Sequence, residues 1–471
     1  MIRYGEGDVI GTEAERRGAD EVRVLAPTAI LGYGYPQASL DAGMAQRPHV
    51  IGIDGGSTDP GPYYLGSGRS FTSRGGVRRD LGPILDAATA AGIPVIVGTS
   101  GGAGGDPHLE WTFEILREVA AAAGHHPRVA IIHAEQPRAR VLDALADGRL
   151  SPIGGAPAAT VDAIERSVRI VGQMGTEPIA AALAAGADVV LAGRACDVSV
   201  FAAVPLARNA APGQTLHAAK IIECGALCAE PSSGSDAILA TIRDGSFDLH
   251  ALGVDRQVTA VSAAAHSLYE QGHPTRIVEP MGTVEVVDAD FTELGDGGVR
   301  ISGSAFEPAT SYSIKVEGAS LEGYRAVTIG GVRDPSAIRR IDDLLDRARR
   351  QVRDTYGEPG PSGSYRLIFR VYGRDAIMGE REPERSSPAH ELGIVLEVVA
   401  DEQGLADDIC ALARSTLLHG DFPERLTVGG NIAFPFSPHD ASWGAVYAFS
   451  LYHRMEIDDP LEPFPIEMRQ L

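Results

Sequence analysis

The first half of the chain alternates short apolar segments with amphipathic segments, and this order restricts the fold more than any other feature. Val22–Ala26 and Val50–Ile53 have the length and composition of strands, whereas Leu81–Ala91 and Leu109–Ala123 have helical periodicity. Parallel strands need long crossovers, which are usually helices. We therefore predict an α/β domain with a mainly parallel sheet flanked by helices. The same pattern predicts further strands and one further helix, at Val95–Val97, Val129–Ile132, Val189–Ala192 and Arg138–Ala146.

The pattern changes after about residue 250. Segments with alternating sides follow at Thr283–Val287, Val299–Ser302, Tyr312–Val316 and Arg325–Ile329. Turn sequences such as GDGG and EGAS lie between them, which favours antiparallel pairing.

The last third of the chain predicts a smaller domain. A helix, two strands and a second helix are expected in this order at Ile338–Val352, Tyr365–Tyr372, Ile394–Val399 and Leu405–Leu418. Together with the strand before them, they suit a split βαβ, ferredoxin-like unit. We expect a large α/β domain over 1–305 that carries the site, and an α+β domain over 306–471. The polar and aromatic run 429–440 is either a cap that closes over the site or a structural tail.

Composition excludes several classes of partner. The formal charge of the 471 residues is −22, and a negative surface repels nucleic acid and anionic membrane, so neither is expected as a partner. No apolar stretch reaches the roughly 18 residues needed to span a bilayer. The first residues contain no apolar signal core, and four cysteines do not make a disulfide framework. A cytoplasmic location is expected.

Polar loops follow four of the expected strands. Ligands of open parallel sheets bind outside the carboxyl ends of the strands, where these loops would converge. Asp54 follows the second strand, His133 and Glu135 follow another, and Arg194 and Asp197 follow the last. Asp54 suits a base or a metal ligand, or else a turn cap. His133 suits a general acid or base, or a hydrogen-bonded wall residue.

A glycine-rich loop after Val97 is a candidate anion site. It precedes a helix expected to start near Pro107, with Asp106 as its cap, and backbone N–H groups at a helix start favour an anion. No Lys-Ser or Lys-Thr follows, so it is not a phosphate loop of the Walker type. Tight-turn packing is the alternative. The candidate binding residues in this loop are Gly98, Ser100, Gly101, Gly102, Gly104 and Gly105.

Several stretches together resemble the acyclic terpene utilisation (AtuA-like) family. ADVVLAGRACDVSVFAAVPL followed by KIIECGALC is similar to a GR-x-x-D-x-S pattern and then an ECG pattern in that family. TSYSIKVEGASLEGYRAVTIGGVRDP and the tail from GNIAFPFSP onward are also similar. The resemblance implies a large α/β domain with a ferredoxin-like one, and a role in breaking down branched or terpenoid acids, often as coenzyme A esters. It marks Arg194, Asp197, Glu223 and Cys224 as site residues.

The function hypothesis is a catabolic lyase of the hydratase, dehydratase or ammonia-lyase type, acting on a small branched carboxylate or its acyl-CoA thioester. One alternative is a metal-dependent hydrolase that uses Asp54, Asp59, His108 or His133 as ligands. Another is a non-catalytic subunit that binds a metabolite. A divalent metal, and coenzyme A as part of the substrate, remain open as cofactors. A homo-oligomer is expected.

Overall fold

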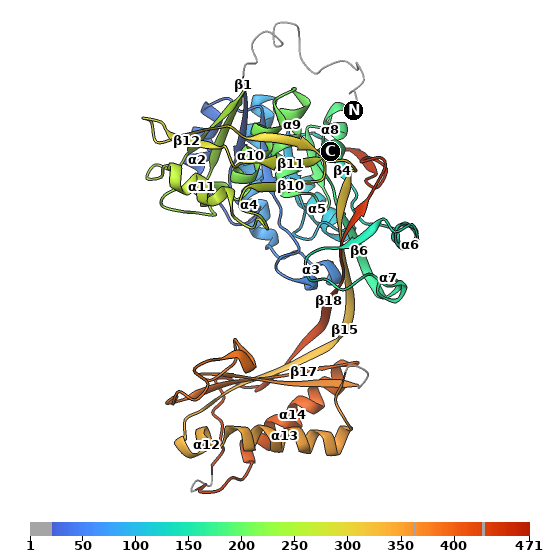
Figure 1. Ribbon diagram of the computed structural model, residues 1–471, viewed down its shortest axis with the longest axis vertical. Helices are drawn as coiled ribbons and strands as arrows, with labels where there is room; N and C mark the ends of the chain where they lie inside the picture. Colours follow the sequence, from blue (N-terminus) through green and yellow to red (C-terminus); the bar gives the residue numbers. More distant parts are fainter. Residues whose placement is uncertain (1–20, 361–363, 426–428) are drawn as a thin grey trace. The chain divides into compact units, whose positions relative to one another are not determined.

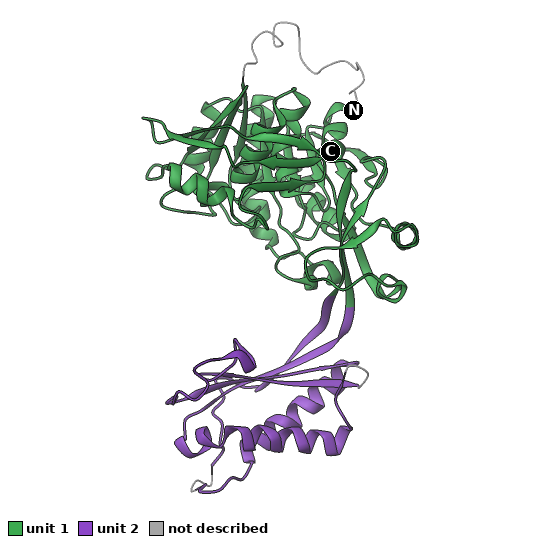
Figure 2. Ribbon diagram, in the orientation of Figure 1, with its two compact units in different colours: residues 1–320, 449–471 green, residues 321–448 purple. Residues whose placement is uncertain are grey.

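The computed structural model describes residues 21–360, 364–425 and 429–471. These form two compact units: unit 1 comprises the chain up to residue 320 together with 449–471, and unit 2 comprises 321–448 (Figure 2). Two long strands, β15 (Ser313–Val332) and β18 (Asp440–Glu456), each begin in one unit and end in the other. The division therefore differs from the expected boundary at 305, because the C-terminal segment returns to unit 1.

Unit 1 is built around a ten-stranded mixed sheet (Figure 1). Its five central strands are parallel and lie in the order β1 (Glu21–Ala26), β2 (Val50–Asp54), β3 (Val95–Gly98), β7 (Val189–Ala192) and β4 (Arg128–Ile132). Antiparallel strands extend both edges, so the expectation of a mainly parallel sheet holds only at its centre. These outer strands are β8 (Ile238–Arg243), β9 (Ser246–Ala251), β13 (Val299–Ser302) and β12 (Asp290–Glu293) beside β1, and β19 (Ile466–Gln470) beside β4.

The antiparallel part has a local cause. Only Asp244 and Gly245 separate β8 from β9, and Gly245 has a φ of 74°. An Asp-Gly pair in a two-residue connection closes a hairpin and leaves no room for a crossover helix.

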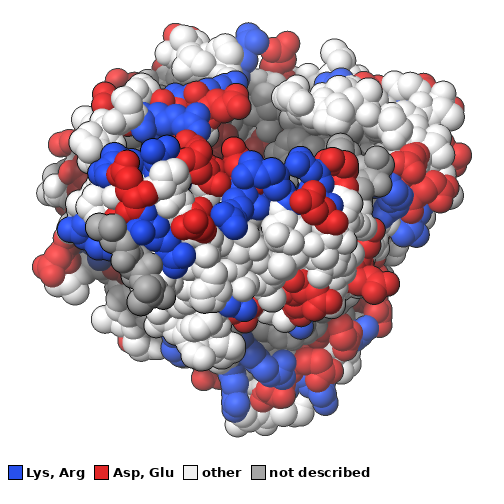
Figure 3. All heavy atoms as spheres, turned by 90° about the horizontal axis from the view of Figure 1, so that it is seen from below, with Lys and Arg blue, Asp and Glu red and all other residues white. Residues whose placement is uncertain are grey.

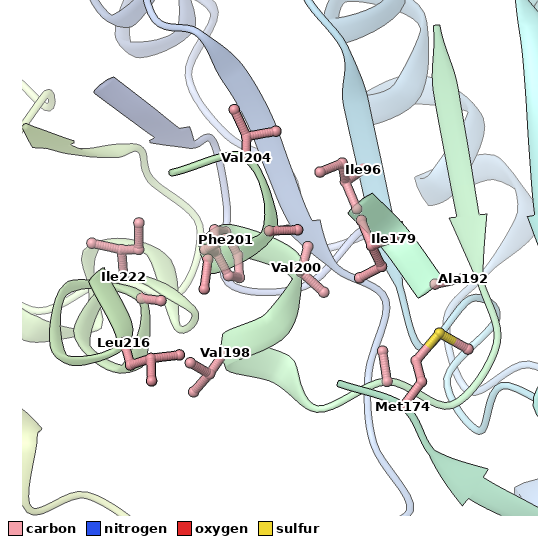
Figure 4. Packing of buried hydrophobic residues seen from close by; sticks show 14 of the residues in the cluster. Ile96, Met174, Ile179, Ala192, Val198, Val200, Phe201, Val204, Leu216 and Ile222 are labelled. Carbon is pink, nitrogen blue, oxygen red and sulfur yellow. The ribbon is translucent and has the colours of Figure 1, made fainter. Parts of the chain in front are cut away.

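Helices cover both faces of the sheet. Successive residues of a strand point to opposite faces, so Val95 and Val97 pack with α4 (Arg74–Ala91) and α5 (Asp106–Ala123). Between them, Ile96 points to the other face and shares a core with residues of α8 (Thr176–Ala184), α9 (Asp197–Ala207) and α10 (Pro212–Ile222) (Figure 4). Most of α9 is buried, which fixes the position of its first turn.

Smaller elements complete unit 1. A three-stranded sheet has the order β10-β11-β14, and β6 pairs with the first part of β15. The remaining elements are α2 (Gln37–Ala45), α3 (Pro62–Ser67), α6 (Arg138–Ala146), β5 (Leu150–Pro152), α7 (Val161–Arg166), β6 (Ser167–Gln173), the 3-10 helix η1 (Gly225–Cys228), α11 (Ala260–Ser267), β10 (Arg276–Glu279), β11 (Gly282–Glu285) and β14 (Ala305–Pro308).

Unit 2 is an antiparallel sheet with helices. The chain runs from β15 through α12 (Pro335–Arg339), α13 (Ile341–Tyr356), β16 (Tyr365–Tyr372), β17 (Leu392–Ala400) and α14 (Gln403–His419) to β18, with one further 3-10 helix, η2 (Gly379–Arg381). The strand order is β16-β17-β15-β18. Apolar side chains of α13 and α14 share one core with those of β16 and β17.

One prediction for the first part of β15, in unit 1, was wrong. The sequence EGAS, expected to be a turn between two strands, lies inside the continuous strand β15. Residues 315–320 pair with β6, which holds this stretch extended.

On the face shown in Figure 3, basic and acidic side chains are interleaved in small groups, without a continuous basic region. In the part of the chain that the structure describes, no helix combines the length and the apolar character needed to cross a bilayer.

Candidate active site

The carboxyl ends of the central strands bring several of the expected residues together in unit 1. Asp54, the last residue of β2, pairs with Gly98 at the end of β3. The segment after β3 is hydrogen-bonded to the segment after β7: Thr99 N–H donates to the Gly193 carbonyl at 3.0 Å, and Thr99 Oγ1 donates to the Ala195 carbonyl at 3.2 Å. The carboxyl ends of β2, β3 and β7 therefore form one connected scaffold for Asp54, Arg194 and Asp197.

Arg194 is fixed by a buried carboxylate that the sequence did not identify. Its Nε lies 2.7 Å from Oε2 of Glu317, and both side chains are almost completely buried. Thr58 Oγ1 donates to the other oxygen of Glu317 at 2.6 Å, and Lys315 Nζ lies 2.8 Å from that same oxygen. Burial alone would raise the pKa of Glu317, but the Arg194 and Lys315 cations hold it down at about 2. Glu317 is thus a permanent anion that orients two cations.

Asp54 is buried and in electrostatic contact with a second aspartate. Its Oδ1 accepts a hydrogen bond from Gly56 N–H at 2.8 Å. Burial, and then the charge of Asp197, raise the pKa of Asp54 well above its usual value, against the opposing effects of Gly56 and Arg194. A carboxyl group in this position holds a proton at pH values where an exposed aspartate has lost it.

Asp197 is the member of the cluster that solvent reaches. It is the first residue of α9, and its side chain is 25% exposed. Nη1 of Arg194 lies 3.5 Å from its Oδ1. Burial raises the pKa of Asp197, whereas the positive charges of Arg194 and Lys220 lower it. Exposure and proximity to two cations suit this carboxylate to contact a ligand.

Glu223 adds a third carboxyl group with a raised pKa. It follows α10 directly and forms a buried ion pair with Lys220. Burial raises the pKa of Glu223 to about 8, with Lys220 opposing and Asp197 reinforcing the change. Its Oε2 is buried and has no hydrogen-bond partner among the described residues. An unpartnered buried carboxyl oxygen leaves a position that a ligand could fill.

Two further residues extend the cluster towards β10. Cys196 Sγ donates to Oε2 of Glu279 at 2.9 Å, and burial raises the pKa of Glu279 to about 7. The sequence offered one signal for Glu279. Alternate residues of β10 are buried, and Glu279 lies on the same buried side of the strand as Ile277. Lys220 offered no comparable signal, because it lies within an otherwise ordinary helix.

Cys224 lies beside this cluster but is not an activated nucleophile. Burial and the charge of Glu223 raise the pKa of its thiol. The neutral thiol reacts poorly, because the thiolate is the nucleophile. The same effects, with Glu279 in place of Glu223, raise the pKa of Cys196.

His133 and Glu135 belong to other ion pairs. His133 Nδ1 lies 2.7 Å from Oδ1 of Asp106, and its Nε2 lies 3.7 Å from Glu467 on β19. Glu135 accepts from Arg169 Nε at 2.6 Å. Neither residue is among the main charges that shift the pKa of Asp54, Asp197 or Glu223. The expectation that they join the Asp54 cluster therefore finds no support in the geometry.

The glycine-rich loop packs tightly instead of presenting an open anion cradle. Three of its N–H groups are already engaged: Gly102 donates to Thr99 O at 3.0 Å, Gly104 to Ser100 O at 3.2 Å and Gly105 to His108 Nδ1 at 3.2 Å. A Cβ on Gly104 would lie 2.2 Å from the backbone nitrogen of Arg194. The glycines thus allow this loop to approach the Arg194 backbone. A Cβ on Gly98, Gly101 or Gly102 would lie 2.0, 2.7 or 2.3 Å from a neighbouring side chain, and Ser100 is fully buried.

The proposed metal ligands do not converge. Both ring nitrogens of His108 are occupied, by Gly105 N–H on one side and by the Tyr64 and Arg69 carbonyls on the other. Asp59 is exposed and accepts from Ser57 Oγ at 2.8 Å. Within the described ranges, no group of three or more His, Cys, Asp or Glu residues is arranged to hold a metal ion. Asp106 begins α5 with Gly105 at the cap position, one residue earlier than expected.

Comparison with known proteins gives one match. The model of a family described as acyclic terpene utilisation family protein AtuA matches residues 74–420, which is more than half of the chain. The matched range contains Arg194, Asp197, Glu223, Glu279 and Glu317, whereas Asp54 precedes it. No curated protein and no solved structure matches the chain.

Proposed function

The chain belongs to the acyclic terpene utilisation family, and from this premise we propose that it is a catabolic enzyme of the lyase type whose proton-transfer groups are Asp54, Asp197 and Glu223. The family description gives a catabolic role in acyclic terpene utilisation. The reaction we propose is the addition or removal of water, or of ammonia, next to the carbonyl of a small branched carboxylate or its acyl-CoA thioester.

One observation supports this proposal most strongly: three neighbouring carboxyl groups whose pKa values are all raised. Proton transfer is most efficient when the pKa of the acid or base lies near the working pH. Environments that move the pKa values of neighbouring carboxyl groups by different amounts allow one group to be the base while another remains an acid.

The geometry suggests a role for each group. Asp197 is the partly exposed carboxylate next to Arg194, so it would remove the proton beside the substrate carbonyl. Glu223, with a pKa of about 8, is mostly protonated at neutral pH and would donate to the carbonyl oxygen through its free carboxyl oxygen. The Lys220 ammonium beside it would stabilise the negative charge that develops there. The protonated Asp197 would then pass its proton to the departing hydroxide or amine, which leaves as water or ammonia, and Glu223 would take back the enol proton as the double bond forms. Asp54 would exchange protons with Asp197.

A solvent-exchange experiment tests this role without knowledge of the natural substrate. The purified protein is incubated in D₂O with a branched acyl-CoA thioester, and with the corresponding free acid, and mass spectrometry measures deuterium at the carbon next to the carbonyl. We expect exchange with the wild type and its loss in Asp197→Asn. Asp248→Asn is the control, because it makes the same change at a buried aspartate that pairs with Arg243 and Arg300 on the outer strands, away from this cluster. Tight binding without exchange would favour a metabolite-binding subunit instead.

We also propose three further features. Unit 2 would be a ferredoxin-like unit, and the position of β17 between β15 and β16 supports this proposal. The protein forms a homo-oligomer, which light scattering of the full chain would test. It works in the cytoplasm, in keeping with its free cysteines.

A further inference from the structure

A large groove lies in unit 1 at the amino ends of the parallel strands, whereas Asp54 lies at their carboxyl ends. Its lining includes Val95, Arg128 and Val189, which are the first residues of β3, β4 and β7. Asp54 and the segment Arg194–Asp197 instead lie at or after the last residues of β2 and β7. The groove has a volume of about 1220 Å³, more than the roughly 300–1,000 Å³ of most small-molecule sites. It is therefore large enough for an extended chain.

The walls of the groove are mainly apolar. They come from the C-terminal parts of α4 and α9, from both ends of α8 and from the strand starts, and include Ile93, Ala180, Ala184 and Leu206. The alanines on α8 have small side chains, which leave space in the groove. A surface of small aliphatic side chains suits an apolar chain, because each methylene group removed from water contributes about 0.8 kcal/mol.

Two cations at this groove have no anionic partner. Arg128 and Arg208 both line it, and neither side chain forms an ion pair or a hydrogen bond with any of the described residues. Three carboxylates also line the groove, and each accepts a hydrogen bond. Asp188 accepts from the Arg128 backbone N–H at 2.8 Å, Glu177 from the Tyr312 hydroxyl at 2.6 Å, and Asp459 from the Leu461 N–H at 2.9 Å.

We propose that this groove binds an amphipathic carboxylate, with its apolar chain along α8 and α9 and its carboxylate facing the guanidinium groups of Arg128 and Arg208. The charge supports this choice of ligand, because two unpaired guanidinium groups beside an apolar groove complement an anion in a chain whose net charge is −22. The site is separate from the carboxyl cluster and does not rest on the proposed function.

Octanoate is the probe for this site. Isothermal titration of the full chain with octanoate measures Kd for the wild type and for four variants. We expect Ala184→Trp to abolish binding, because Ala184 is exposed at the end of α8 and an indole there fills the groove without disturbing the core. The double variant Arg128→Gln/Arg208→Gln should weaken binding at least about tenfold, as expected when charge-assisted hydrogen bonds are lost.

Two controls make the result specific. Arg78→Gln removes an exposed arginine of α4 that lies outside the groove, so Kd should not change. Asp54→Asn should also leave Kd unchanged, which separates this site from the carboxyl cluster even if the proposed chemistry is wrong. The absence of saturable octanoate binding to the wild type, or an unchanged Kd in the double arginine variant, would overturn the proposal. So would light scattering in which Ala184→Trp splits a dimer, because the groove would then hold a second copy of the chain.

Discussion

Arg194 and Glu317 form a buried ion pair across unit 1, with Arg194 Nε 2.7 Å from Oε2 of Glu317. Arg194 follows β7 and Glu317 lies in β15, so the pair connects the central sheet to a strand that comes more than a hundred residues later. Arg194 Nη1 also donates to the Ala195 carbonyl at 3.0 Å and to Thr99 Oγ1 at 3.2 Å. The pair therefore supports the loop that carries Asp197.

Breaking this pair from either side should destabilise the fold. Arg194→Ala leaves the Glu317 carboxylate buried with one of its two cations, Lys315. The loss should therefore be at most the roughly 3–5 kcal/mol that an uncompensated buried charge typically costs. Urea denaturation should show a loss within this limit for Arg194→Ala, and a smaller summed loss for Arg194→Ala/Glu317→Gln than for the two single variants added together. Strict additivity of the two losses would contradict a direct interaction.

The stability of the fold should decrease as pH rises towards 8. The pKa of Glu223 is raised from 4.5 to about 8 and that of Glu279 to about 7, so the folded state binds protons that the unfolded chain has already released. Such groups stabilise the fold fully below about pH 4.5, and their contribution is lost as pH rises through the folded-state pKa. Histidines whose pKa values are lowered by burial oppose this trend below about pH 7, and they include His49, His108, His217 and His266. Between pH 7 and 8.5 the free energy of unfolding should fall by more than about 1 kcal/mol.

The variant Glu223→Gln checks the assignment of this pH dependence. Glutamine does not titrate, so its free energy of unfolding should fall less over the same pH range, and the variant should gain on the wild type at pH 8.5. Glu317 does not interfere, because its pKa of about 2 keeps it charged throughout this range. Parallel pH profiles for the two proteins would show that Glu223 does not titrate as described.

The thiols of the site should be unreactive. Since burial raises the pKa of Cys224, iodoacetamide at pH 7.5 should leave the folded protein active, and Cys224→Ser should keep its turnover within about threefold of the wild type. Mass spectrometry of the treated protein locates any label. Labelling of Cys224 in step with loss of turnover would restore the nucleophile hypothesis.

The central part of the site was predictable because strand ends are visible in the sequence. The strand Val189–Ala192 and the helix Arg138–Ala146 have the expected bounds. The residues that follow the five parallel strands lie at the same end of the sheet. Asp54 and Asp197 could therefore be selected from local pattern alone. Glu223 was selected only by its family motif, and that family is confirmed by the match over residues 74–420.

The rest of the cluster depends on packing between distant segments. Glu279 and Glu317 come from β10 and β15, and nothing local to these strands predicts that they contact Cys196 and Arg194. The surroundings of His133 also depend on packing between distant segments. The sequence did not show that the C-terminal strand β19 pairs with β4. This pairing brings Glu467 to 3.7 Å from His133 Nε2.

Asp54→Asn should separate chemistry from stability. Asparagine keeps the shape of the side chain and can still accept from Gly56 N–H, while it removes a charge that burial and Asp197 disfavour. The free energy of unfolding should therefore stay within about 1 kcal/mol of the wild type, or rise. If Asp54 exchanges protons during turnover, the rate constant should fall on the order of a hundredfold.

The matched control for this last variant is Asp248→Asn, which should show the opposite pattern. Asp248 is as buried as Asp54, but it pairs with Arg243 and Arg300 on the outer part of the sheet, away from the parallel strand ends. Its loss should lower the free energy of unfolding by about 1–3 kcal/mol and leave the rate constant unchanged. Thermal midpoints and rate constants, measured side by side for the three proteins, decide the matter. Near-normal turnover in Asp54→Asn would reduce Asp54 to a turn cap and leave Asp197 and Glu223 as the proton-transfer pair.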